Sequence, residues 1–137
     1  MRPDFEIANF VAPTIVAVVF ILIMSTAKEP TRQNFNAVAS AGFATLYANG
    51  GFGMWEVAYM AVAFFPAYLG LRSYSWIGVV WLMHAGWDLA HHLYGNTLFH
   101  WAPSSSFGCL VMDAIVSVWF FLGAPSIFDR YRAQESL

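Results

Sequence analysis

Charged residues are scarce in this chain, and the few basic ones are scattered along it. Of its 137 residues only 10% are charged, whereas soluble domains average about 25%. Nucleic-acid binding needs clustered Lys and Arg, so we expect no nucleic-acid partner. Cys109 is the single cysteine, which rules out an internal disulfide bond. The hydrophobic share is 59%, against roughly 45–50% in average proteins, and this composition predicts an integral membrane protein.

Long apolar runs are present, and their number predicts the fold. Four runs are long enough to cross a bilayer as helices of about 20 residues. We therefore expect an all-α protein, an integral membrane bundle of four transmembrane helices in a single domain over residues 1–137. The expected spans cover residues 7–24, 54–71, 76–94 and 107–127.

A further apolar stretch, residues 37–47, is too short to cross a membrane as a helix. The glycine-rich residues 50–53 follow it and favour a turn. The stretch could be a short re-entrant or interfacial helix, or the first part of one broken helix before the second span. The glycine segment could equally be a simple flexible loop.

Basic residues outside the spans bear on the orientation in the membrane. With four spans both termini share a side, and four of the six Lys and Arg residues lie there. Cytoplasmic loops carry an excess of Lys and Arg, so we expect a multi-pass protein of the bacterial inner membrane with both termini cytoplasmic. If residues 37–47 also spanned, five of the six basic residues would lie on one side and the amino terminus outside.

A group of polar residues interrupts the third apolar run. At 100° per residue its four ionisable side chains fall within about one quadrant of a helix. Such groups in lipid are costly unless something satisfies them, so this stripe is the leading candidate for a functional site. The stripe consists of His84, Asp88, His91 and His92.

Two further acidic residues are expected near this stripe. Glu56 lies in the first turn of the second span and Asp113 near the start of the fourth. Counting from the connecting loops places both in one layer with His91, while Asp88 lies one turn deeper and His84 near the midplane. The spans contain no Lys or Arg, so these carboxylates need a metal ion, protonated histidines or protons of their own.

Imidazole with carboxylate is typical of sites for zinc, iron, manganese or copper. We expect the protein to bind a divalent metal ion, zinc ahead of iron, and to act on a lipid or another apolar small molecule. Hydrolysis ranks slightly ahead of oxidation as the reaction. Glu56 and Asp113 would be the catalytic residues, as general base or as completing ligands. The expected metal ligands are His84, Asp88, His91 and His92.

Other interpretations use the same residues differently. A small carrier or channel for protons, metal ions or a solute would use them as a relay and would be a homo-oligomer, because four helices enclose little lumen. A structural subunit of a membrane complex would pair its acids with a partner's bases. Hydrogen bonding between helices could also account for Asp113, which has Ser117 on its face.

Two known kinds of iron site offer partial parallels. Asp88-x-x-His91 is similar to the Glu-x-x-His element of di-iron bundles, of which the chain has one copy. Together with His92 it also resembles part of the histidine boxes of membrane desaturases and hydroxylases, which use many more histidines.

A pair of motifs in the second half resembles a known family. The motifs are Trp87-Asp88-Leu89-Ala90-His91-His92-Leu93-Tyr94-Gly95-Asn96 and Pro103-Ser104-Ser105-Ser106-Phe107-Gly108-Cys109, followed by Asp113-Ala114. They resemble short bacterial and fungal integral membrane proteins that are catalogued as a domain of unknown function. The resemblance implies residence in a membrane and assigns neither a reaction nor catalytic residues.

Overall fold

The computed structural model describes residues 6–48 and 50–135. Throughout that part of the chain the secondary structure is helical, with no strand, as the composition and periodicity predict. The helices are α1 (Ala8–Thr26), α2 (Thr31–Phe43), α3 (Met54–Gly70), α4 (Tyr74–Tyr94), α5 (Ser105–Phe121) and α6 (Asp129–Glu135).

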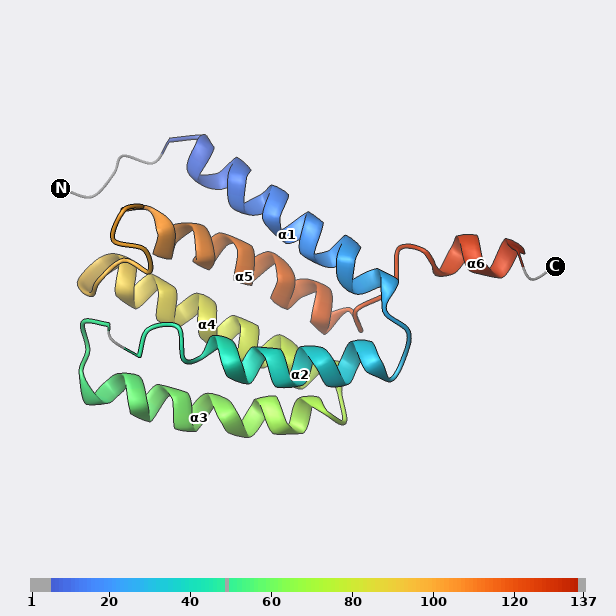
Figure 1. Cartoon of the computed structure of the whole chain (residues 1–137), viewed down its shortest axis with the longest axis horizontal. Coiled ribbons are helices and arrows are strands. Elements are labelled where there is room, and N and C mark those ends of the chain that lie inside the picture. Colours follow the sequence, from blue (N-terminus) through green and yellow to red (C-terminus); the bar gives the residue numbers. More distant parts are fainter. Residues whose placement is uncertain (1–5, 49, 136–137) are drawn as a thin grey trace.

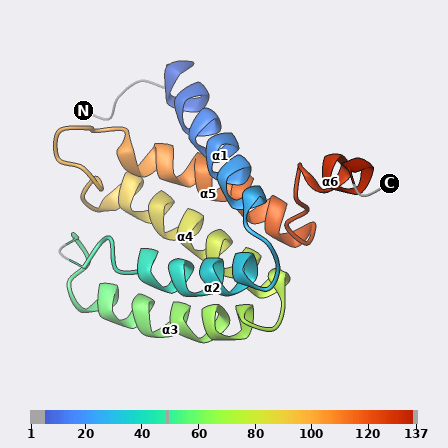
Figure 2. The same ribbon diagram turned by 45° about the vertical axis from the view of Figure 1, so that its right-hand side comes forward.

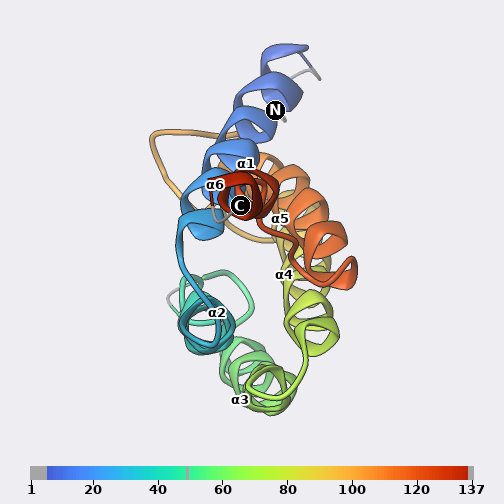
Figure 3. The same cartoon turned by 90° about the vertical axis from the view of Figure 1, so that its right-hand side faces the viewer.

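Helices α1 to α5 run roughly along one direction and alternate in sense (Figure 1). The α4 helix is central, because it packs most extensively against α5 and also contacts α3 and α2. The α1 helix covers the outer side of α5, and α2 lies beside α3 (Figures 2 and 3). The short α6 helix projects from one end of the bundle (Figure 1).

The chain passes along the bundle five times before α6, because α2 follows its length in the opposite sense to α1 and α3 (Figures 1 and 2). Four of these helices overlap the expected spans, and α2 overlaps the stretch 37–47 whose path the sequence left open. The amino-terminal end of α1 and the α6 helix lie at opposite ends of the bundle (Figure 1).

The α2 helix starts earlier than the sequence predicts, at Thr31 instead of residue 37. The polar residues just before residue 37 argue against a helix in that segment. Contacts with other parts of the chain satisfy their side chains. The Gln33 side chain donates a 2.9 Å hydrogen bond to the carbonyl oxygen of Gly70, at the end of α3. Such contacts override local preference, which is a weak guide to helix bounds.

The α5 helix ends sooner than expected, at Phe121 instead of residue 127. Gly123 has a φ of 84°, and the amide of Ala124 donates to the carbonyl oxygen of Trp119 at 2.9 Å. These are features of a Schellman-type helix end, and Pro125, which follows, cannot continue the helix.

Apolar side chains fill the interior and also cover much of the outside. Ile77, Val116 and Phe120 are fully enclosed in a core shared by α1, α4 and α5. The α1 helix, by contrast, leaves most of its apolar residues exposed. Its 19 residues are long and apolar enough to cross a membrane, whereas α5 is apolar but shorter at 17 residues. Within the part of the chain that the structure describes, one helix is therefore a candidate membrane span by length and composition.

Candidate functional site

One face of α4 carries the predicted polar stripe into the bundle. His84, Asp88 and His91 are buried, and Trp87 lies between them on the same face. Their spacing of three and four residues brings them onto one side of an α-helix. Neighbouring helices then supply partners to each, so that the stripe is divided into separate centres.

The first centre pairs His91 with Glu56 near one end of the bundle. The Nε2 atom of His91 lies 3.0 Å from Oε1 of Glu56, and both side chains are almost fully buried. The indole N–H of Trp87 donates to the other carboxyl oxygen at 2.9 Å. The amide of Phe52 donates to Oε1 at 3.3 Å, at the start of α3. The carboxyl group of Glu56 is thus held from both sides.

The Nε2 atom of His91 faces the carboxyl group of Glu56, but within the described residues it makes no hydrogen bond of good geometry. The Nδ1 atom of His91 faces the carbonyl oxygen of Asn96 at 3.2 Å, and a carbonyl can only accept, so Nδ1 carries a hydrogen. A neutral ring would then point the lone pair of Nε2 at a carboxylate oxygen. A proton on either the imidazole or the carboxyl group would turn this contact into a favourable one, so the pair is suited to hold a proton.

Aromatic rings enclose this pair. The ring of Tyr47 stacks on His91 with centroids 3.8 Å apart and planes within 8°. Phe52 lies on another side at 4.5 Å, and Trp87 meets the imidazole edge-on at 5.7 Å. Gly50 approaches so closely that a Cβ there would lie 2.6 Å from Oε1 of Glu56. Water therefore has little room beside the pair.

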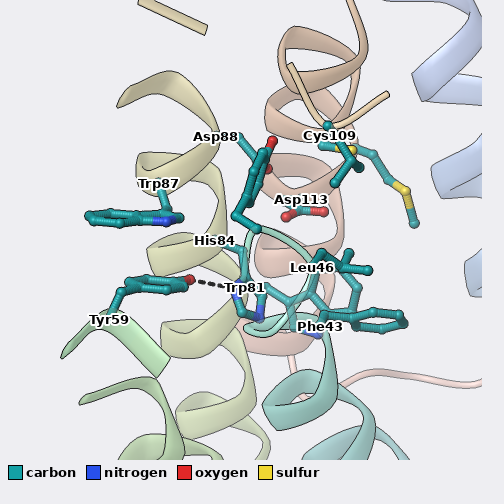
Figure 4. A pocket seen from close by; sticks show the side chains of 12 residues that line it. Phe43, Leu46, Tyr59, Trp81, His84, Trp87, Asp88, Cys109 and Asp113 are labelled. Atoms are coloured by element: carbon teal, nitrogen blue, oxygen red, sulfur yellow. Dashed lines mark hydrogen bonds between the residues drawn. The ribbon is translucent and has the colours of Figure 1, made fainter. Parts of the chain in front are cut away.

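The second centre is formed by Asp88 of α4 and Asp113 of α5. Both carboxyl groups are buried and interact with each other. Both also line the cavity drawn in Figure 4. Within the described residues, Oδ2 of Asp88 is buried without a hydrogen-bond donor. No Lys or Arg lies on α4 or α5 to neutralise the pair. Two adjoining carboxyl groups in such surroundings share at least one proton.

Tyr47 orients the carboxyl group of Asp88. Its hydroxyl lies 2.8 Å from Oδ1 of Asp88 and 2.8 Å from Oγ of Ser106. The amide of Leu98 donates to that Oγ at 3.1 Å. Tyr47 has one hydroxyl proton, so when Asp88 is ionised Tyr47 donates to its carboxylate and accepts from the hydroxyl of Ser106. A directed chain of hydrogen bonds thus leads from the loop before α5 to Oδ1.

The third centre is the pair His84 and Tyr59. The Nε2 atom of His84 donates to the carbonyl oxygen of Ser40 at 2.8 Å, which leaves Nδ1 to accept from the Tyr59 hydroxyl. Figure 4 shows this contact between α3 and α4. Both ring nitrogens are therefore engaged. Tyr59 also stacks on Trp87 at 4.5 Å, which links this centre to the first.

A cavity of about 120 Å³ joins the second and third centres. Asp88, Asp113, His84 and Tyr59 line its inner part (Figure 4). Phe43 and Leu46, which also line it, are 39% and 55% exposed, so they mark its opening at the surface of the bundle. The cavity therefore presents an acidic interior behind an apolar mouth.

The predicted site residues are all near α4, but they do not form one cluster. Glu56 and Asp113 both face α4 and take different partners, His91 and Asp88. His92 is half-buried against the ring of Phe107, 5.4 Å away between centroids.

The donors of these centres do not fit the expected metal ion. Among the described residues no three His, Cys, Asp or Glu side chains gather closely enough to hold one. Both nitrogens of His84 and Nδ1 of His91 are already hydrogen bonded. A catalytic metal site typically needs three protein ligands. We therefore derive no step through a metal.

Sequence reasoning missed several residues that complete these centres. Tyr59 lies one turn after Glu56, so the helical period could have indicated it. Trp87 lies within the stripe on α4, one residue before Asp88, but an apolar ring gives no signal of a polar site. Tyr47 and Ser106 come from a turn and from the first turn of α5, and the sequence gives no spacing signal for their meeting with Asp88.

Comparison with known proteins agrees with the resemblance seen in the two motifs. No curated protein and no solved structure matches the chain significantly. A family model described as a family of unknown function matches residues 8–126, which include α1 to α5. The match covers far more than half of the 137 residues. The chain therefore belongs to the Family of unknown function (DUF6010).

Proposed function

We propose that this protein is a multi-pass membrane protein in which Asp88 and Asp113 perform acid–base chemistry on a small apolar molecule, such as a lipid or a fragment of one. The observation that carries the proposal is the adjoining pair of buried carboxyl groups on the wall of a cavity with an apolar mouth. The reaction class that fits this pair best is hydrolysis.

Exposed apolar surface supports the membrane part of the proposal. Met54, Trp55 and Phe65 of α3 are 78%, 72% and 65% exposed, and α1 is similarly apolar on its outer side. Contiguous apolar surface of this extent is unusual in soluble monomers. In a bilayer the lipid tails would cover it, and the aromatic residues near the helix ends would lie at the interfaces.

Charge distribution supports one orientation for a five-pass arrangement. Lys28, Arg32 and Arg72 belong to the connections and helix start at the end of the bundle that carries α6 (Figure 1). The two connections at the opposite end, residues 44–48 and 50–53 and residues 95–104, contain no Lys or Arg, which leaves Arg2 as the one basic residue on the amino-terminal side. By the positive-inside rule the α6 end is cytoplasmic and the amino terminus lies on the other side. The expected placement of both termini in the cytoplasm then gives way to this one.

The carboxyl pair can supply both halves of a hydrolytic step. Two adjoining carboxyl groups that share a proton offer an acid in one and a base in the other. The base would take a proton from water as it attacks the substrate, and the acid would give a proton to the leaving group. Tyr47 holds Oδ1 of Asp88 by hydrogen bonding, whereas Oδ2 has no hydrogen-bond partner among the described residues.

The metal-dependent form of this chemistry is less well supported, because the candidate donors are engaged elsewhere. Elemental analysis of the purified protein tests this point. We expect no stoichiometric zinc or iron after purification without chelators. Stoichiometric metal that is lost in His91→Ala, with the fold retained, would restore the metal-dependent interpretation.

The proposed activity is tested with the purified protein in vesicles made from a total bacterial lipid extract. The lipids are compared by mass spectrometry after incubation with the wild type, Asp113→Asn or Asp129→Asn. We expect the wild type to convert at least one lipid species, and Asp113→Asn to slow the conversion by about 100-fold. Asp129 is exposed on α6, so the same chemical change there should leave the rate unaltered. A wild type that converts no species, or an Asp113→Asn variant as active as the wild type, would exclude the proposal.

A second candidate function is a proton carrier. The three polar centres follow one another along α4, from His91 through Asp88 to His84, and each contains an exchangeable proton. A series of such sites is typical of proton pathways in membranes. Vesicles loaded with a pH-sensitive dye test it. Flux that is driven by a pH gradient and lost in both Asp113→Asn and Glu56→Gln would favour the carrier over the enzyme.

A further inference from the structure

We propose that the polar pocket between residues 45–48, Gly50 and residues 96–100 is a second, water-facing entrance to the carboxyl cavity, and that Tyr47 is the residue that closes it. The pocket would bind water or a small uncharged hydroxylated molecule as the polar co-reactant. This proposal rests on the proposed function for the role of the inner cavity as a reaction site. Its geometry stands on the described residues alone.

The pocket lies directly behind the carboxyl cavity. It has a volume of about 270 Å³ and is lined by Thr45, Leu46, Tyr47, Ala48, Gly50, Asn96, Thr97, Leu98 and His100. Three of these residues, Leu46, Tyr47 and Leu98, also line the inner cavity of about 120 Å³. These three side chains therefore border both spaces and form a partition between them.

The chemistry of the outer pocket is polar and uncharged. Its lining contains the Thr45 and Thr97 side chains and the amide of Asn96, and no Asp, Glu, Lys or Arg. Asn96 and His100 are exposed, so the pocket opens to the outside at this end of the bundle. Hydroxyl and amide groups bind water and small neutral alcohols, whereas ions would find no opposite charge here. The inner cavity, in contrast, opens past Phe43 and Leu46.

Two entrances of opposite character suit a reaction between an apolar molecule and water. The substrate would enter from the lipid side past Phe43, and water would arrive from the aqueous side past Tyr47. The same separation keeps bulk water away from Asp88 and Asp113 while the passage is closed. Displacement of Tyr47 would break its hydrogen bond to Oδ1 of Asp88, so opening and the orientation of the carboxyl group are linked.

Cys109 provides a direct readout of this passage. It is the single cysteine of the chain and lines the inner cavity beside Asp113. A small, charged, membrane-impermeant thiosulfonate reagent can reach it from water only through an aqueous route. Labelling of Cys109 is measured by mass spectrometry on the full chain in phospholipid vesicles, with the reagent on both sides. The variant Cys109→Ser gives the background.

We expect slow labelling in the wild type and an increase of about tenfold in Tyr47→Ala, because the closing side chain is gone. Adding Thr97→Trp to Tyr47→Ala should return labelling to the slow rate, since the indole fills the outer pocket. Tyr68→Ala, which removes an exposed tyrosine on α3 that lines neither space, should leave the rate unchanged. Thermal unfolding of every variant shows whether the fold is retained.

Leu98→Ala opens the same partition from its other side and serves as the test if Tyr47→Ala does not fold. Folded variants that label no faster than the wild type would overturn the proposal. Faster labelling that Thr97→Trp does not suppress would overturn it too, because the reagent would then enter from the lipid side. Labelling does not depend on turnover, so an inactive protein that labels as expected would refute the proposed function and leave the second entrance standing.

Discussion

Oε1 of Glu56 and Nε2 of His91 lie 3.0 Å apart, and both side chains are almost completely shielded from solvent. Removing one partner of such a pair leaves the other buried without compensation, which typically costs about 3–5 kcal/mol. We therefore expect Glu56→Ala to lower the free energy of unfolding by about 3 kcal/mol. Val57→Ala, on the exposed side of the same helix, should cost far less. Denaturant titration in detergent measures both, and equal losses would mean that the pair contributes nothing specific.

Gly50 offers a sharper test of the same centre. A Cβ at this position would lie 2.6 Å from Oε1 of Glu56 and 2.9 Å from the carbonyl oxygen of Tyr47. Backbone cannot move away as a flexible side chain can, so Gly50→Ala should destabilise the protein by about 1–3 kcal/mol. Gly86, inside α4, has open space around it, and alanine there should raise stability by about 0.5–1 kcal/mol.

Opposite shifts in melting temperature for these two Gly→Ala variants check the prediction. A neutral or stabilising Gly50→Ala would show that Tyr47 and Gly50 do not pack against the Glu56 and His91 pair as described.

The sequence predicts that Glu56 and His91 lie at the same depth in the bundle, but it does not predict the partner of Asp113. Antiparallel neighbours share a loop, and counting residues from it places Glu56 and His91 in one layer. Asp113 was expected in that layer, six residues into a span that begins at residue 107. The helix begins at Ser105, so Asp113 lies about 3 Å deeper, at the level of Asp88.

Residues outside the long apolar runs were harder to predict. The stripe on α4 follows from the helical period, because a single regular element fixes the relative directions of its side chains. Tyr47 lies beyond the last residue of α2, in a turn whose path depends on contacts with α4 and α5. The start of α2 is hard to predict for the same reason, because it depends on a contact between distant parts of the chain. Gln33 finds its hydrogen-bond partner at the end of α3.

Glu29, in the connection between α1 and α2, should give the protein a measurable pH dependence. Partial burial raises the pKa of Glu29, but hydrogen bonds from Tyr74 and Arg32 outweigh this and hold it below the ordinary value of 4.5. Because the folded-state pKa is lowered, the stabilising contribution is present above that value and is lost as the pH falls through the folded-state pKa. The carboxyl group is nearly half exposed, so the contribution is modest.

Melting temperatures measured between about pH 6 and pH 3, in steps of about 0.5 pH units, check this prediction. The wild type should lose stability more steeply below about pH 4.5 than Glu29→Gln does. Glu6→Gln, at an exposed position before α1, should follow the wild type throughout. Parallel curves for the wild type and Glu29→Gln would show that the contacts of Glu29 do not distinguish its two protonation states.

Val116 and Val118 allow the core of the bundle to be compared with its outer surface by one chemical change. Both lie on α5, and Val116 is fully buried whereas Val118 is 57% exposed. Val116→Ala removes two methyl groups from a packed interior and should cost about 2 kcal/mol, as lost transfer energy plus a cavity. Val118→Ala should cost under about 0.5 kcal/mol, because lipid or detergent can fill the space. Denaturant titration of the two variants measures the difference, and a larger loss from Val118→Ala would mean that the outer face of α5 packs against protein.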